Sequence, residues 1–153
     1  MNSVPRCLVD TSVLARLANN SDVHYPVALH AVTELHLQGV QLCITPQNLI
    51  EFRNVATRSN SENGLGYSVA EVEAKAVEFE ALFILLDDVA SIYEAWKTLV
   101  HQAGIIGKQV HDARLMACCQ VHSLRCVLTF NGRHFVRFLP YMPGWSVIDP
   151  HSI

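Results

Sequence analysis

Three acidic side chains stand beside apolar stretches of this sequence. Asp10 ends the apolar run of residues 7–9, Glu51 lies within the segment LIEFRNVA, and Asp112 precedes apolar residues three, four and seven positions further on. An unpaired buried carboxylate is costly or takes up a proton. With the carboxamide of Asn131, these groups would form an all-oxygen site, which suits Mg²⁺ or Mn²⁺ rather than Zn²⁺.

Each of the four residues also has a purely structural explanation. Asp10 is of a type that often caps a helix or forms a turn. Glu51 is compatible with a solvated helix face, and Asp112 with a first-turn residue facing the helix dipole. Asn131 precedes Gly132, and an Asn-Gly pair is first of all a turn signal. The chemical interpretation therefore depends on whether the fold brings the four together.

Short apolar strands alternate with helices along the chain. Strands are expected at 7–9, 41–45, 83–86 (buried), 126–129 and 145–148. Helices are expected at 11–18, 26–38, 68–82, 111–122 and 133–138, with one more that begins at 46 and another that follows the third strand and ends at about 103. Thr11 and Ser12 offer capping hydroxyls for the first helix. This alternation predicts right-handed βαβ units and a parallel sheet covered on both faces. Ligands of such sheets bind at the carboxyl ends of the strands, where Asp10 and Asn131 are expected.

Composition narrows the class of protein. The 153 residues are 50% hydrophobic and 16% charged, which excludes a disordered chain. No apolar stretch approaches the ~20 residues that span a bilayer, and we expect no signal peptide, because no basic region followed by an apolar one opens the chain. The net charge of −3 argues against a generally basic nucleic-acid-binding surface, although not against a local basic rim. Five cysteines without a C-x-x-C motif fit a reducing compartment, and we expect a cytoplasmic protein made of one domain over 1–153.

Four segments of the chain resemble the PIN domain in motif order and spacing. They are LVDTSVLARL, TPQNLIEFRNVATR, VHDARLMACC and VLTFNGRHF, and the similarity is closest to bacterial toxins of the VapC type. The resemblance implies a PIN-like three-layer α/β/α sandwich around a five-stranded parallel sheet. It also implies a metal-dependent endoribonuclease, with a small antitoxin protein and a second copy of the chain as partners.

The matching motifs make Asp10, Glu51 and Asp112 the acids that hold Mg²⁺ or Mn²⁺. Members of the family often carry a further acid in the segment that matches 129–135, where this chain has Asn131 and His134. We expect Asn131 to orient a water molecule. This departure leaves the number of metal ions open, and it leaves a non-catalytic PIN fold that binds RNA or a protein as the alternative.

Further residues are expected around the acids. Thr11, Ser12 and Thr129 are candidates to position the metal ligands. Arg133 and Arg137, four residues apart, are candidates to bind flanking phosphates of single-stranded or structured RNA, although a solvated helix face would explain them equally well.

Three other site types fit the sequence less well. A phosphatase of the D-x-D type would need an acid at Ser12, and a receiver-like domain built on residues 87–88 would need a better placed lysine than Lys108. A zinc site at Cys118, Cys119 and His122 lacks a fourth ligand at suitable spacing.

Overall fold

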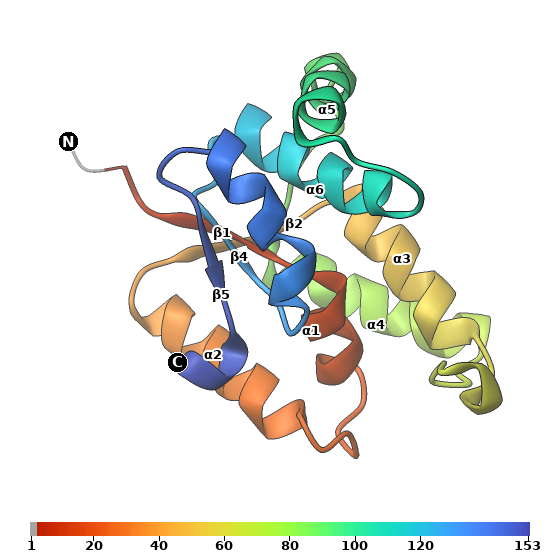
Figure 1. The fold of residues 1–153 in the computed structure, drawn as a ribbon. Helices are drawn as coiled ribbons and strands as arrows, with labels where there is room; N and C mark the ends of the chain where they lie inside the picture. Colours follow the sequence, from red (N-terminus) through yellow and green to blue (C-terminus); the bar gives the residue numbers. More distant parts are fainter. Residues whose placement is uncertain (1–2) are drawn as a thin grey trace.

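The computed structural model describes residues 3–153, which form a five-stranded sheet flanked by helices (Figure 1). The strands are β1 (Arg6–Val9), β2 (Gln41–Ile44), β3 (Ile84–Leu85), β4 (Cys126–Leu128) and β5 (Ser146–Ile148). The α-helices are α1 (Thr11–Leu17), α2 (Tyr25–Leu37), α3 (Pro46–Thr57), α4 (Val69–Leu82), α5 (Ala90–Ala103) and α6 (Gln109–Val121). Short 3₁₀ helices are η1 (Asn60–Glu62), η2 (Gly132–His134), η3 (Val136–Tyr141) and η4 (Pro150–Ser152).

The sheet is parallel throughout, in the order β3-β2-β1-β4-β5, as the alternation of elements predicts. The chain builds outward from β1 to β2 and β3 on one side, then crosses to β4 and β5 on the other. The order therefore reverses between β1 and β4, which is where a parallel sheet opens a crevice for a ligand. Asp10 directly follows β1 at this point.

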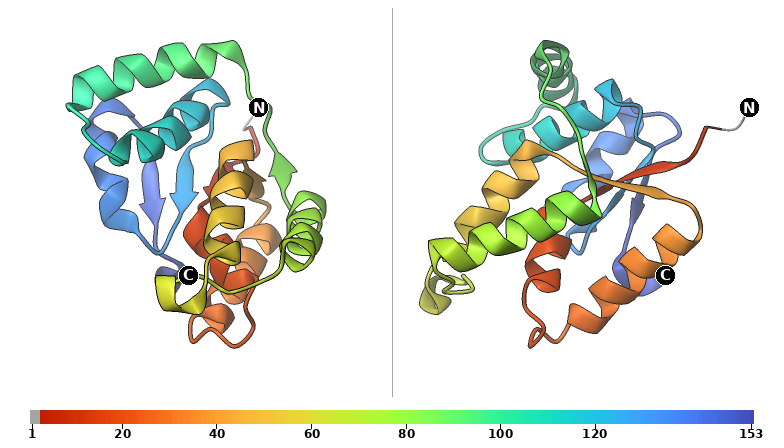
Figure 2. Two further views of the ribbon diagram at one scale, coloured as in Figure 1. Left: turned by 90° about the vertical axis from the view of Figure 1, so that its right-hand side faces the viewer. Right: turned by 180° about the vertical axis from the view of Figure 1, so that it is seen from behind.

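Helices cover both faces of the sheet. Cys7 and Val9 pack with α1 to α4 on one face, whereas Leu8 packs with α5 and α6 on the other, because successive side chains of a strand point to opposite faces. Figure 2 shows α3 and α4 side by side within the first layer. The predicted three-layer α/β/α arrangement is confirmed.

The start of α1 differs from the expectation. Asp10, not Thr11 or Ser12, is the N-cap residue, and its Oδ2 accepts a hydrogen bond of 3.4 Å from the backbone N of Ser12. The two hydroxyls have other partners, as described below. The structural explanation of Asp10 is thus correct without excluding a chemical one.

Strand β3 is the clearest correction. Residues 83–86 were expected to form a buried strand, yet only Ile84 and Leu85 are in the strand and they are 41% and 42% exposed. Phe83 and Leu86 on either side are buried. The reason is position: β3 is an edge strand that pairs with β2 alone, and the helices do not cover it.

No helix among residues 3–153 is long and apolar enough to cross a membrane. Four of the five thiols are buried and Cys126 is half-buried, and all five are free.

Candidate active site

Asp10 is held at the reversal point of the sheet by two hydroxyl groups. Asp10 is only 5% exposed, and its Oδ2 accepts hydrogen bonds from Ser12 Oγ at 2.8 Å and from Thr129 Oγ1 at 2.7 Å. Both hydroxyls accept in turn from backbone N–H groups, those of Phe130 (3.1 Å) and Asn131 (2.9 Å). Their own protons are therefore directed at Asp10.

Glu51 is held in the same manner from two helices. Thr11 Oγ1 donates to Oε2 at 2.9 Å and Gln47 Nε2 donates to Oε1 at 2.8 Å. Asn48 Nδ2 donates to Thr11 Oγ1 at 3.2 Å, which directs the threonine proton to the carboxylate. Asn48 is itself fixed by the capping box of α3, where its Oδ1 accepts from Thr45 N and Oγ1, each at 2.9 Å.

The side chain of Asp112, in the first turn of α6, makes no hydrogen bond to another described residue, and the residue is half-buried. Burial raises the pKa of its carboxyl to about 6; the positive charge of His134 opposes this rise, and the negative charges of Asp10 and Glu51 add to it. The three carboxylates thus interact electrostatically, and Asp112, whose pKa is raised, is the one that lacks hydrogen-bond donors.

The three acids line one cavity at the carboxyl end of β1. Asp10, Glu51 and Asp112 border it together with Asn131 and His134. A second hollow continues it toward the start of α6 and shares Thr11, Glu51, Asp112 and His134. We refer to both as the acidic cavity.

The donors around the acids are neutral hydroxyls, amides and backbone N–H groups. Such donors orient a carboxylate without removing its charge, so repulsion between the acids persists until a cation binds. The carboxylate oxygens of the three acids are ligands that suit a hard divalent ion. They do not form a preassembled cage, because among residues 3–153 no group of three His, Cys, Asp or Glu side chains is already arranged to hold a metal ion.

The remaining expected residues lie at different distances from the acids. Asn131 lines the cavity, is exposed, and caps η2. Arg133 and Arg137 are exposed and fall on two successive 3₁₀ helices, not on one α-helical face. Neither borders the acidic cavity.

Several residues that hold the acids or border the cavity were not predicted from the sequence. Gln47 is the i−4 neighbour of Glu51 on α3, a spacing that is readable in the sequence. Asn48 and Arg16 carry no comparable signal, because their contacts come from elements distant along the chain.

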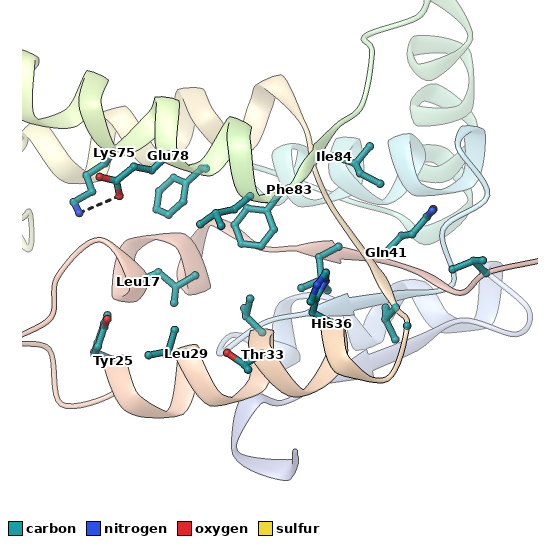
Figure 3. A pocket seen from close by; sticks show the side chains of 17 residues that line it. Leu17, Tyr25, Leu29, Thr33, His36, Gln41, Lys75, Glu78, Phe83 and Ile84 are labelled. Atoms are coloured by element: carbon teal, nitrogen blue, oxygen red, sulfur yellow. Dashed lines mark hydrogen bonds and ion pairs between the residues drawn. The ribbon is translucent and has the colours of Figure 1, made fainter.

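Apart from the acidic cavity, a depression of about 690 Å³ lies between α2 and α4 (Figure 3). Its lining is mainly apolar and includes Leu29, Leu82 and Ile84, which are 44%, 71% and 41% exposed. The ion pair of Lys75 and Glu78 lies at its α4 side. We call this depression the apolar groove.

Known proteins share this architecture. The PIN domain model matches residues 7–138. A chain of the VapBC2 complex from Rickettsia felis, solved with promoter DNA, aligns with a TM-score of 0.66 at 14% identity, over 94% of this chain and 98% of that one. A toxin–antitoxin complex from Klebsiella pneumoniae aligns with a TM-score of 0.63 at 21% identity, over 94% and 97%.

A third similar structure is VapC20 from Mycobacterium tuberculosis, described as a toxin that cleaves the sarcin-ricin loop. It aligns with a TM-score of 0.59 at 20% identity, over 84% of this chain and 92% of that one. No protein of curated function matches this sequence. Because the family model covers most of the chain, this chain belongs to the PIN domain family.

Proposed function

We propose that this protein is a metal-dependent endoribonuclease of the VapC toxin type. One observation carries the proposal: three carboxylates, one directly after β1 and the others on α3 and α6, border a single cavity at the point where the sheet order reverses. Two of them are oriented only by neutral donors, and the third has a raised pKa. Such a cluster is complete only with a cation.

Asp10, Glu51 and Asp112 would hold Mg²⁺ or Mn²⁺. When bound, the ion would lower the pKa of a bound water and neutralise charge that develops on the scissile phosphate. Ser12 and Thr129 keep the Asp10 carboxylate oriented, and Thr11 and Gln47 do the same for Glu51. Asn131, which also borders the cavity, would orient a water molecule.

The test uses purified protein with single-stranded and structured RNA, with Mg²⁺ or Mn²⁺ and with EDTA, beside Asp10→Asn and Asp112→Asn. We expect internal cleavage of RNA that EDTA abolishes and that both variants lose. Cleavage that persists in EDTA or in both variants would contradict the mechanism. Manganese binding and RNA binding without cleavage would favour the alternative, a PIN fold that binds RNA without cutting it.

A small antitoxin is the partner we propose for the apolar groove. Two solved relatives are toxin–antitoxin assemblies, and the groove exposes apolar side chains from two helices that the chain itself leaves uncovered. An apolar helix face of a partner would bury them. A homodimer, a cytoplasmic location and one PIN domain over residues 1–153 remain predictions.

The groove is tested by co-expression with a candidate antitoxin, taken as any small protein that an adjacent gene encodes, followed by size-exclusion chromatography. We expect Leu82→Glu to release the partner and Leu37→Glu to retain it, because Leu37 is equally exposed (72%) but lies outside the groove. Retention of the partner by Leu82→Glu would exclude this surface.

A further inference from the structure

Arg16, in the last turn of α1, borders the acidic cavity on the side of Asp10. Its Nη1 donates to the backbone O of Ser12 at 2.9 Å, and its guanidinium carbon lies 4.6 Å from the centre of the Phe130 ring. Ser12 also donates to Asp10. The guanidinium is thus fixed relative to the first acid.

Phe130 is in turn held by several elements. Its backbone N donates to Ser12 Oγ at 3.1 Å, and its ring packs against the rings of His24 and His151 at 5.6 and 5.5 Å. Arg16 lies over the face of this ring, so Phe130 holds the guanidinium by a cation–π contact. The face that Arg16 covers is not free to stack on a nucleobase.

No carboxylate neutralises the charge of Arg16 within residues 3–153. Arg53 and Arg114 form ion pairs with Glu73 and Asp88, at 2.8 and 3.2 Å. Arg16 pairs with no carboxylate of the described chain, and its buried Nε lacks a hydrogen-bond partner there. A fixed, unneutralised guanidinium beside an acidic cavity is suited to an anion, and its fork geometry matches phosphate oxygens.

A second cation lies at the other end of the cavity. Lys108, next to α6, borders the part of the acidic cavity that Arg16 does not reach, and both parts share Glu51 and Asp112. A strand that runs from Arg16 to Lys108 would therefore pass over the acids.

We propose that Arg16 binds the phosphate next to the scissile one and positions the RNA strand across the acids, from α1 toward α6. The inference rests on the proposed function, since it assumes that RNA enters this cavity. It assigns to Arg16 the phosphate contact that the sequence suggested for Arg133 and Arg137.

Salt dependence separates a phosphate contact from a structural role. We would measure binding of a short fluorescein-labelled single-stranded RNA by anisotropy at about 50 to 200 mM salt, in an Asp112→Asn background that prevents cleavage. Each phosphate contact on a single strand contributes about 0.7 to the slope of log affinity against log salt. We expect Arg16→Gln to weaken binding about tenfold at the lowest salt and to reduce the slope by about 0.7.

Two variants serve as controls. Arg16→Lys keeps the charge and should restore the slope, with weaker binding because lysine lacks the fork. Arg125→Gln removes an exposed charge just before β4, at the opposite end of the sheet, and should leave the slope unchanged.

The results distinguish the two proposals. RNA cleavage by the wild type, together with an unchanged slope in Arg16→Gln, would overturn the inference and leave the proposed function intact. A reduced slope in Arg133→Gln or Arg137→Gln but not in Arg16→Gln would also overturn it. If the wild type neither binds nor cleaves RNA, both proposals fail. Arg16→Gln could lower the melting temperature of the protein. In that case, a lowered melting temperature in Arg16→Lys as well, with a salt slope that stays reduced, would mark Arg16 as a structural residue and overturn the inference.

Discussion

The acidic cavity and the apolar groove are incomplete in opposite ways. In the cavity, Asp10 and Glu51 are fully oriented by hydrogen bonds, but their charges are not neutralised. In the groove, Leu29 and Leu82 carry no charge, but they remain exposed to water. A bound cation would neutralise the charges in the cavity, and the apolar surface of a partner would cover the exposed side chains of the groove.

The two regions also differ in how much of the fold they require. The cavity draws on the residue after β1, on α1, α3 and α6, and on the segment after β4, and hydrogen bonds join Asp10 and Glu51 to several of these elements. The groove lies mainly between α2 and α4. Substitutions in the cavity should therefore affect chemistry strongly, whereas substitutions in the groove should affect association and leave chemistry alone.

Asp10→Asn should give the largest effect. Loss of one charged ligand at the proposed metal site should lower the rate of RNA cleavage at least about a thousandfold. The measurement is cleavage of labelled RNA with Mg²⁺, and Glu80→Gln on the exposed face of α4 is the control. If Asp10→Asn cleaves RNA at a rate within about tenfold of wild type, the acidic cavity does not carry the chemistry and does not differ from the groove in this respect.

Thr129→Val tests the orienting hydroxyls. The change keeps the shape of the side chain but removes the 2.7 Å hydrogen bond to Asp10, and we expect a rate decrease of about 10- to 100-fold. Thr33→Val, in the groove, is the matched control and should leave the rate unchanged. Equal rates for the two variants would mean that the hydroxyl of Thr129 does not orient the acid.

Asp112→Asn should stabilise the protein while inactivating it. Folding raises the pKa of this carboxyl from 3.8 to about 6, so its ionisation opposes folding. The contribution of the protonated carboxyl to the stability of the wild type is therefore fully present below pH 4 and is lost as pH rises through 6. Without divalent cations at pH 7, urea unfolding should show the variant more stable by about 1 to 2 kcal/mol. The two proteins should converge near pH 4.

Asp149→Asn provides a control of opposite sign. A hydrogen bond from the backbone of His151 lowers the pKa of Asp149, so its contribution is present above the normal aspartate pKa and is lost as pH falls. This variant should not gain stability at pH 7. A gain in Asp149→Asn, or none in Asp112→Asn, would contradict this account of the charges.

The smallest effect is expected in the groove. Leu82→Glu should roughly halve the fluorescence of an apolar dye such as ANS, which reports exposed apolar surface. Leu37→Glu, outside the groove, should change it little, and both should cleave RNA at the wild-type rate. Equal dye signals in the two variants would indicate that the groove does not attract apolar ligands.

Local patterns predicted most of the fold. The apolar runs at β1, β2 and β4 and the capping box of Ser68 and Glu71 all lie where expected, because these signals involve neighbours along the chain. The exposure of Ile84 and Leu85 was not predictable, since an apolar run is the same at the edge and in the centre of a sheet.

The sequence alone determined the type of fold, the family and the identity of three acids in apolar surroundings. Hydrophobic periodicity and motif order carry that information without long-range contacts. Only the tertiary structure decided that Thr11, Ser12 and Thr129 each donate a hydrogen bond to a carboxylate, and that Arg16 lies on Phe130 beside the cavity. Those relations join residues up to 119 positions apart, and their geometry follows from the sheet order and helix packing that bring distant segments together.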